Sequence, residues 1–354
     1  MASAITSGFA FNAEEMKDLS GIINEGTFEN KDLKALHVIE TGIKYNKQIV
    51  FAGKMGLMGK AVAGCTPNAV AGIVLTEKFW TPVDEDFRLE HCSADVDTQD
   101  KLLRQMTQMN PDFYDVISGS QSTLGKFLVA NVVEGFNENI LRKIWFSDTA
   151  AANVSGAGVI TNGTDLGYFN TFDGLFKQIF AEVGTGDSNY VSIAENAGAT
   201  YALQALAPDA SIGYLKAMYN SADSRLLSRT DKKFYVTRTI WDGYLNDLES
   251  IQNSGAGNTM INEDGKVSLF YRGVEVVKMD IFDRVIEAYE NNGTTYNLPS
   301  RAVLTVPANV PVATLSEGDF GKVEAFYDMY NKVNVIDGVY TIDAKHLETY
   351  LTVA

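Results

Sequence analysis

The stretch "VSLFYRGVEVVKMDIFDRVIEAY", residues 267–289, reads as a strand, a sharp break at "YRG", a second strand and then an aspartate-rich turn. Two short runs of apolar and β-branched residues separated by a glycine-containing break are typical of paired strands. No catalytic pattern accompanies them. The stretch therefore indicates a structural motif in a chain that shows little chemistry.

Length and composition limit what the rest of the chain can be. With 354 residues, the chain exceeds what one hydrophobic core usually holds, so we expect two domains or an elongated subunit with several lobes. Hydrophobic residues make up 45% and charged residues 21%, as in folded globular proteins. The formal net charge of −16 argues against a protein that grips nucleic acid through a broad basic face.

The densest basic cluster is interrupted by Asp223 and Asp231 and predicts an ordinary solvated loop and strand edge. Its members are Arg225, Arg229, Lys232, Lys233 and Arg238.

Cysteine usage and the absence of targeting segments indicate the compartment. Cys65 and Cys92 are too few for a disulfide scaffold and lack metal-ligand spacing. The first residues lack the pattern of a signal peptide, and no apolar run reaches the roughly 18 residues that a bilayer span needs. We expect a soluble chain made in a reducing cytoplasm, with no membrane contact.

The first third of the chain predicts an arm, an unusual apolar segment and a pair of strands. Residues 1–43 read as a polar, partly helical arm, with Asn12 as a helix cap. Residues 49–75 are apolar but rich in glycine, which disfavours a helix and favours an extended hairpin or flexible arm. Such an arm would be an aggregation hazard on a monomer, so we expect it to lie on another subunit; a buried, loop-rich core segment is the alternative. "EKFWTPVDEDFRLEHC", residues 77–92, reads as strand, turn and strand.

The strongest periodicity lies in "STLGKFLVANVVEGFNENILRKIW", residues 122–145. Its apolar residues follow helical spacing, and Ser122 or Thr123 can cap the helix. At about 1.5 Å per residue the helix would be about 35 Å long. The periodic positions are Leu124, Phe127, Leu128, Val132, Phe136, Ile140, Leu141 and Ile144.

The second half predicts alternating helices and strands without any internal repeat. A glycine-rich loop follows the long helix, and residues 172–183 and 209–222 read as helices. Residues 232–248 read as a strand that runs into a helix, with Thr237 or Thr239 near its cap. Residues 301–310, 326–344 and 345–353 alternate strand and short helix.

We predict no catalytic, cofactor-binding or metal-binding residue. The three histidines are His37, His91 and His346, and His91 points away from Cys92 if both lie on one strand. The glycine-rich pieces "GAGVITNG" and "GTGD" are not phosphate-binding patterns. An acidic run lacks the glycine and closing glutamate of a calcium loop and predicts a solvated surface. The acidic residues of the run are Asp84, Glu85, Asp86, Glu90, Asp95, Asp97 and Asp100.

The order of these elements resembles the major capsid proteins of tailed bacteriophages, which have the Hong Kong 97 fold. The resemblance rests on the segments "WFSDTAAANVSGAGVIT", "FNTFDGLFKQI", "KKFYVTRTIWDGYLNDL", "LFYRGVEVVKMD" and "RAVLTVPANV" after the long helix. It runs from about residue 45 to the end and is one of pattern, without a single diagnostic motif. A narrower resemblance, around "EKFWTP" and "FRLEHC", is to the capsid proteins of crAss-like phages.

The resemblance implies an α+β fold with named parts. Residues 267–289 would form a strand pair of the axial domain, in which Gly273 permits close backbone approach and Val274, Val276 and Val277 pack the sheet. The implied parts are an N-terminal arm (1–43), an extended E-loop (44–85), a peripheral P-domain (86–155 and 315–345) with a spine helix (121–146), an axial A-domain (156–314) and a C-terminal tail (346–354).

The resemblance also implies a function. The chain would be a major capsid protein, not an enzyme, and would self-assemble into hexamers and pentamers of an icosahedral shell. The shell would enclose double-stranded DNA without sequence-specific binding, which suits an acidic chain. Its location would be the virion after synthesis in the bacterial host cytoplasm, and its partners the portal and scaffolding, decoration or head-fibre proteins. No covalent cross-link through Lys54 or Lys60 is expected, because no partner for either is evident.

Two other functions stay open at this point. The same fold could form an encapsulin-like nanocompartment around an enzyme cargo. A soluble α+β enzyme or ligand-binding protein is the alternative from another class, and perturbed titrating groups converging in one deep pocket would favour it. The triangulation number, the host and the need for a scaffold or maturation protease do not follow from the sequence.

Overall fold

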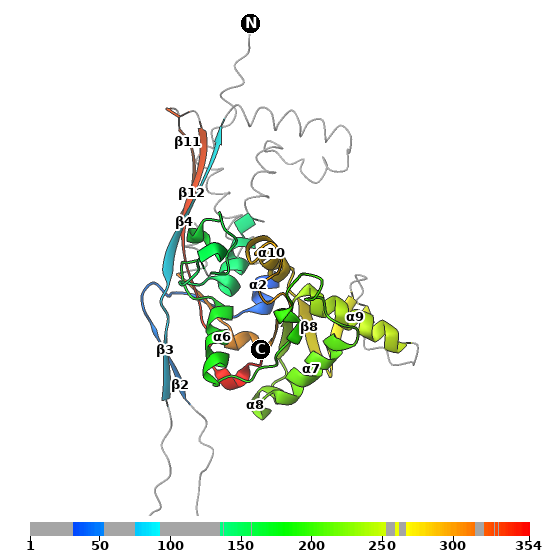
Figure 1. The fold of residues 1–354 in the computed structure, drawn as a ribbon. Helices are drawn as coiled ribbons and strands as arrows, with labels where there is room; N and C mark the ends of the chain where they lie inside the picture. Colours follow the sequence, from blue (N-terminus) through cyan, green and yellow to red (C-terminus); the bar gives the residue numbers. More distant parts are fainter. Residues whose placement is uncertain are drawn as a thin grey trace, which may run out of the picture.

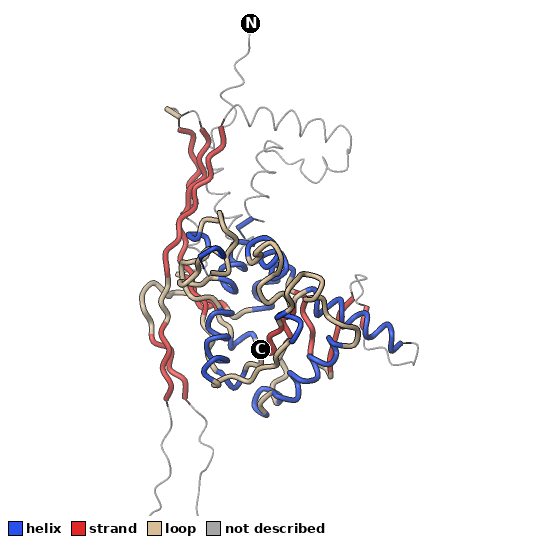
Figure 2. The backbone as a smooth tube through the Cα atoms, viewed as in Figure 1, coloured by secondary structure: helices blue, strands red, loops and turns tan. Residues whose placement is uncertain are grey.

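The computed structural model describes residues 31–52, 75–92, 135–136, 138–156, 158–252, 259–261, 267–315, 322–328, 330–331 and 333–354. These residues form a rounded body of helices and sheets from which two long β structures project in opposite directions (Figures 1 and 2). The α+β class expected from the sequence is confirmed. The first part of the arm (residues 1–30), the glycine-rich segment 53–74, and residues 121–134 of the predicted long helix lie outside the described residues.

One five-stranded sheet forms the centre of one half of the body. Its strand order is β6-β7-β8-β5-β9, with β5 parallel to β8 and the other pairs antiparallel. Helices α7 (Ala210–Ser221) and α9 (Arg238–Gln252) enclose a core with this sheet, centred on Leu215, Phe234 and Leu304. The strands are β5 (Lys233–Val236), β6 (Thr259–Ile261), β7 (Val267–Tyr271), β8 (Val274–Lys278) and β9 (Ala302–Thr305).

The motif at residues 267–289 contains the predicted strand pair, β7 and β8. Arg272 and Gly273 form the two-residue connection with φ of 48° and 77°, as in the turns that suit a twisted hairpin. A Cβ added at Gly273 would meet nothing within 4 Å, so the predicted close backbone approach is wrong, and the positive φ explains the glycine. Val274 and Val276 are buried as expected, and Val277 is partly buried against the neighbouring core.

The aspartate-rich turn predicted after β8 is also wrong, because residues 280–289 form helix α10 (Asp280–Tyr289). Asp280 and Asp283 lie in its first turn, where acidic side chains favour a helix through its dipole. Ile281, Phe282, Val285 and Ile286 form a buried stripe at helical spacing. The aspartates thus mark the start of a helix.

We expect Gly273→Ala to lower the free energy of unfolding by about 1 kcal/mol, because alanine is strained at positive φ. Gly213→Ala is the matched control: Gly213 lies within α7, its added Cβ would meet nothing within 4 Å, and the change should stabilise by about 0.5–1 kcal/mol. Urea unfolding of the unassembled subunit measures both changes. Equal effects of the two substitutions would contradict this account of the turn.

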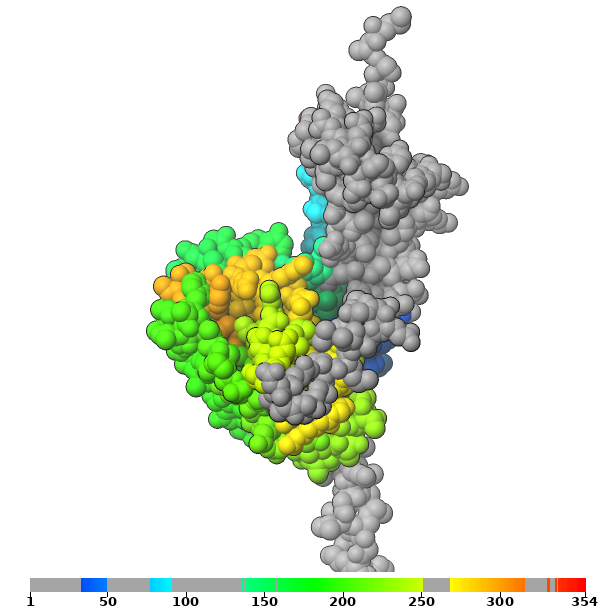
Figure 3. Space-filling model, turned by 90° about the vertical axis from the view of Figure 1, so that its right-hand side faces the viewer, coloured from blue at the N-terminus to red at the C-terminus, as the bar shows by residue number. Residues whose placement is uncertain are grey.

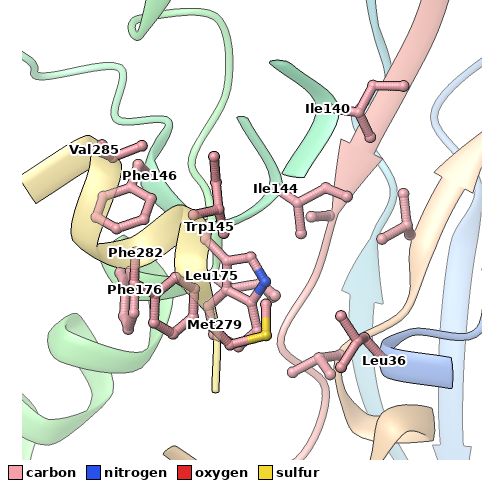
Figure 4. Close-up of a cluster of buried hydrophobic side chains, with 14 of the residues drawn as sticks. Leu36, Ile140, Ile144, Trp145, Phe146, Leu175, Phe176, Met279, Phe282 and Val285 are labelled. Carbon is pink, nitrogen blue, oxygen red and sulfur yellow. The ribbon is translucent and has the colours of Figure 1, made fainter. Parts of the chain in front are cut away.

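A second core joins the other half of the body to the projecting β structure that contains β12 (Val333–Ala344). It is built from the helical residues 138–146, from α6 (Leu175–Thr185) and from α10. Trp145 lies at its centre, beside Phe176 and Phe282 (Figure 4). Its ring centroid is 4.9 Å from that of Phe282, 5.1 Å from that of Phe176 and 5.6 Å from that of Tyr235. Residues 138–146 are the end of the long helix predicted from the sequence, and this part of the prediction is confirmed.

The first of the two projecting structures, here called the long sheet, is the three-stranded outer part of a five-stranded sheet. Its central strand β12 (Val333–Ala344) pairs antiparallel with β4 (Val83–Cys92) on one side and β11 (Lys322–Asp328) on the other. At the body end, β12 pairs with β10 (Val312–Thr314), which pairs with β1 (Ile39–Glu40). In Figure 3, β4 (cyan) rises from the rounded body (green to orange).

The second projecting structure is a two-stranded ribbon, here called the β2–β3 ribbon. It consists of β2 (Gln48–Ala52) and β3 (Leu75–Phe79), paired antiparallel from Gln48↔Phe79 to Ala52↔Leu75. An extended hairpin was predicted at residues 49–75, and the pairing of β2 with β3 brings the two ends of that segment together as such a hairpin requires. The strand, turn and strand predicted at residues 77–92 are β3 and β4, but they belong to different sheets.

The C-terminal residues are packed into the body. Val353 is fully buried and forms isolated bridges to Asn189 and Leu304. The short helices predicted within residues 326–344 are absent from the described part of that range, where β11 and β12 form a hairpin. The remaining short elements are α2 (Lys31–Leu36), α8 (Ser224–Leu227), η2 (Val154–Gly156), η3 (Leu166–Tyr168), η4 (Ala194–Ala197), η5 (Pro307–Asn309) and η7 (Thr349–Leu351).

Candidate functional site

The long sheet is held on the body by a buried ion pair. Lys143, from the helix 138–146, donates to the carboxylate of Glu85 on β4, and both side chains are less than a tenth exposed. Tyr340 of β12 donates to the same Glu85 carboxylate and accepts from Asn139 at 2.9 Å. Burial, with the nearby Glu85 charge, raises the pKa of Tyr340 well above its ordinary value. The tyrosine therefore stays protonated and acts as a hydrogen-bond donor.

Aromatic rings pack against one another beside this ion pair, whose side chains are shielded from water. Phe136 lies 5.0 Å from Tyr340 and 5.2 Å from Phe87, measured between ring centroids. Glu85 thus lies on the body-facing side of β4 together with Phe87, although it belongs to the acidic run predicted to be a solvated surface. For Glu85 that prediction is wrong, because Lys143 and Tyr340 compensate its buried charge.

The remaining acidic and basic clusters carry ordinary surface interactions where they are described. Asp84 accepts from Thr341 at 2.5 Å, and Glu90 pairs with Arg88 at 2.7 Å. Asp95, Asp97 and Asp100 lie outside the described residues.

Among the residues that the structure describes, no group of three or more histidine, cysteine, aspartate or glutamate side chains could hold a metal ion. The basic cluster consists of paired side chains, through Arg225–Asp223, Arg229–Asp231, Lys233–Glu275 and Arg238–Asp242, while Lys232 donates to backbone carbonyls.

The histidines are structural where their side chains are described. His346 is buried, with Nε2 2.7 Å from Thr352 Oγ1 and Nδ1 2.5 Å from Glu182 Oε2. His37 is buried beside Trp145, whose Nε1 donates to His37 Nε2 at 3.2 Å. The side chains of Cys65, His91 and Cys92 lie outside the described residues, so the predicted separation of His91 from Cys92 stays a prediction.

His37 gives the subunit a pH-dependent stability. Its Nδ1 lies 2.8 Å from the carbonyl oxygen of Val310, and burial lowers its pKa to about 4. As the pH falls, His37 is therefore protonated near pH 6.5 in the unfolded chain but only near pH 4 in the folded chain. Stability from this residue is complete above pH 6.5 and is lost as the pH falls toward 4.

We expect the His37 contribution to fall by about 3 kcal/mol between pH 7 and pH 4. Urea unfolding of the unassembled subunit at several pH values measures this, with His37→Gln as the comparison that removes the titrating group. The variant should show a shallower loss of stability over this range. Parallel pH profiles for the two proteins would contradict the assignment.

Two neighbouring cavities open on the body, of about 340 and 320 Å³. They share Asn196, Ala197 and Leu298, and Leu298 has a positive φ of 45°. Arg301 lines the larger cavity and Glu290 the smaller one, and the two form a buried ion pair. Arg301 also donates to the backbone carbonyl oxygens of Leu298 and Asn297.

Titrating groups do not converge in these cavities in the manner expected of an active site. Tyr214 lines the larger cavity, and burial together with its hydrogen bond to Glu195 raises its pKa to about 12. A tyrosine with a raised pKa is less ionised at neutral pH, so little of the phenolate that could act as a base or nucleophile is present. The cavities therefore give no support to the enzyme alternative.

Comparison with known proteins identifies the fold. No protein-family model and no curated protein matches the chain. A chain in the structure of the satellite phage P4 procapsid including size determination (Sid) protein matches with a TM-score of 0.55 and 11% identity, over 99% of this chain and 93% of that chain. A chain in the structure of Gordonia phage Cozz matches with a TM-score of 0.51 and 11% identity, over 91% of this chain and 84% of that chain. The chain has the Hong Kong 97 capsid fold.

The resemblance seen in the sequence is thus confirmed at the level of this capsid fold, whereas the narrower resemblance to crAss-like phages is not confirmed. The β2–β3 ribbon and the long sheet are the two structures that project from the body. Both expose apolar side chains: Tyr45 and Phe79 at the base of the ribbon, and Leu89 and Val339 on the long sheet.

Proposed function

We propose that this chain is the major capsid protein of a tailed double-stranded DNA bacteriophage. Copies of it would assemble into hexamers and pentamers of an icosahedral shell that encloses the genome. The observation that carries this proposal is the match to a chain of the P4 procapsid structure over nearly the whole length of both chains. The proposed role is structural and without catalysis, as suits a chain whose matches come from capsid structures.

The parts of the chain acquire roles under this proposal. Residues 1–43 are the N-terminal arm, 44–85 the E-loop with the β2–β3 ribbon, 86–155 and 315–345 the P-domain, 156–314 the A-domain and 346–354 the C-terminal tail. The core around Trp145 contains both Ile144, from the spine of the P-domain, and Phe282, from the A-domain. The two domains thus share one packed core, which favours a rigid subunit body. The β2–β3 ribbon and the long sheet, which project from this body, would then make the contacts between subunits.

The charge of the chain suits a container for DNA. A net charge of −16 and basic side chains that are paired in the described part of the densest cluster give weak attraction for phosphate. Weak attraction lets the polymer move during packaging and release.

None of the described helices combines the length and the apolar run needed to cross a bilayer.

The partners expected of such a shell are the portal and the scaffolding, decoration or head-fibre proteins, and its expected location is the virion after synthesis in the host cytoplasm. Co-expression with the neighbouring genes, followed by density-gradient purification and nucleic-acid analysis, tests the function. We expect DNA-filled particles in which this chain is the most abundant protein. Particles that contain a host enzyme and no DNA would assign it to a nanocompartment instead.

A further inference from the structure

The direction of the β2–β3 ribbon relative to the body is set by contacts at its base. The ribbon has two strands and no third strand beside it among the described residues. Trp80, directly after β3, is buried with Ile43 and Ala313 in a small cluster of its own. The backbone N–H of Thr81 donates to Asp343 at 2.7 Å, which fixes the chain at this point. Ile49 of β2 packs against the same cluster, so Trp80, Thr81 and Ile49 together form a first anchor at the base of the ribbon.

Lys78 supplies a second anchor two residues further along the ribbon. Its Nζ donates to Glu182 Oε1 of α6 at 3.0 Å and to the carbonyl oxygen of His346 at 2.7 Å. The Lys78 and Glu182 side chains are only 28% and 19% exposed, so the contact is shielded from solvent. Figure 1 shows α6 beside the body end of the ribbon.

The acceptors of Lys78 are held in place by their own contacts. Glu182 Oε2 lies 2.5 Å from His346 Nδ1, and the His346 backbone N–H donates to Gln178 of α6 at 2.9 Å. Burial alone would raise the pKa of Glu182, but the hydrogen bonds and charges of His346 and Lys78 outweigh it and lower the pKa. Glu182 is thus an anion that is already held in position. Little further conformational entropy of Glu182 is lost when Lys78 binds to it.

We propose that Lys78 is a positioning residue for assembly, which fixes the direction of the β2–β3 ribbon by tying it to Glu182 and His346. Two anchors fix a direction more firmly than one. This inference rests on the proposed function, because the direction of the ribbon decides where it meets a neighbouring subunit. Loss of the second anchor should change the particle much more than it changes the stability of the body.

Lys78→Met tests the proposal, since methionine keeps much of the apolar stem and removes the charge. Lys47→Met, at an exposed lysine of the same ribbon base, is the matched control. We expect Lys78→Met to reduce the yield of uniform closed shells by about tenfold and to broaden their size distribution, with an unfolding midpoint close to that of the parent. Lys78→Arg, which keeps a cationic donor, should restore shells in part. Glu182→Gln should give the same defect as Lys78→Met.

Hydrogen exchange of the β3 amides in the unassembled subunit measures the tether independently of assembly. We expect exchange about tenfold faster in Lys78→Met than in Lys47→Met. Normal shells with unchanged exchange in Lys78→Met would overturn the proposal. If the parent chain and Lys47→Met also form no shells, either alone or with the products of the neighbouring genes, the proposed function fails. The exchange result alone then decides whether Lys78 holds the ribbon.

Discussion

Trp145→Ala is expected to lower the free energy of unfolding of the subunit by about 3–5 kcal/mol and to abolish assembly of soluble subunits at physiological temperature. Trp145 is fully buried between Phe176, Phe282 and Tyr235. The substitution removes the largest side chain of this core and leaves a cavity that rigid aromatic neighbours close poorly. It also removes the Nε1–H that satisfies His37 Nε2.

Tyr190→Ala is the control for Trp145→Ala, because Tyr190 is 60% exposed and its loss should change stability by about 0.5 kcal/mol or less. Trp145→Phe should fall between the two, since phenylalanine refills part of the space without the N–H donor. Chemical unfolding followed by circular dichroism gives the three values. A Trp145→Ala variant as stable as Tyr190→Ala would show that the core described around Trp145 is not the one that holds the subunit.

Lys143→Met is expected to destabilise the subunit by about 3–5 kcal/mol, because it leaves the Glu85 carboxylate buried without its cation. Tyr340 alone can still donate to the carboxylate, which limits the loss but does not neutralise the charge. The long sheet should loosen first, since Glu85 lies on β4 and Lys143 on the helix beneath it. We expect the substitution to increase the hydrogen-exchange rate more in β4 and β12 than in β5 and β8, which would show that the long sheet is the part destabilised.

The double variant Lys143→Met/Glu85→Leu is the control that separates charge from packing. With both charges gone, apolar side chains of similar length fill the same space, and stability should return close to that of the parent. The measurement is a double-mutant cycle in urea. Strict additivity of the two single substitutions would contradict a direct interaction between Lys143 and Glu85.

Local sequence patterns predicted the elements whose contacts lie close in the sequence. Helices α6 and α7 and the strand that runs into α9 were found from their periodicity and are confirmed. The two strand-like runs and the break at "YRG" between them predicted the hairpin β7–β8, which is confirmed. The parallel pairing of β5 with β8 could not be found in this way, because it joins strands about 40 residues apart through contacts that no local pattern encodes.

Helix α10 was missed although the sequence contained its pattern. Ile281 and Val285, and Phe282 and Ile286, are four residues apart on one helix face. Asp280 and Asp283 indicate a turn when read as a local pattern, whereas in the first turn of a helix such acidic residues are favourable. A count of apolar residues at helical spacing over residues 280–289 would have distinguished the two structures.

The buried charges were missed for a different reason. Glu85 alternates with Val83 and Phe87 on one side of its strand, and Lys143 lies three residues after Ile140 in the apolar stripe of its helix. Each is a charged residue at an apolar position, which hints at a buried pair, but only the structure shows that they face each other. The Lys78 contact with Glu182 has no sequence pattern at all, since 104 residues separate the two.

The most direct test of the central claim is the mass and image of the particles that the purified chain forms. Sedimentation and negative-stain electron microscopy should be applied to the chain expressed alone and together with the products of its neighbouring genes. We predict closed shells, or rings of six and five subunits, in at least one of these preparations. A monomer or dimer in both, at the highest concentrations attainable, would contradict the assignment as a capsid subunit.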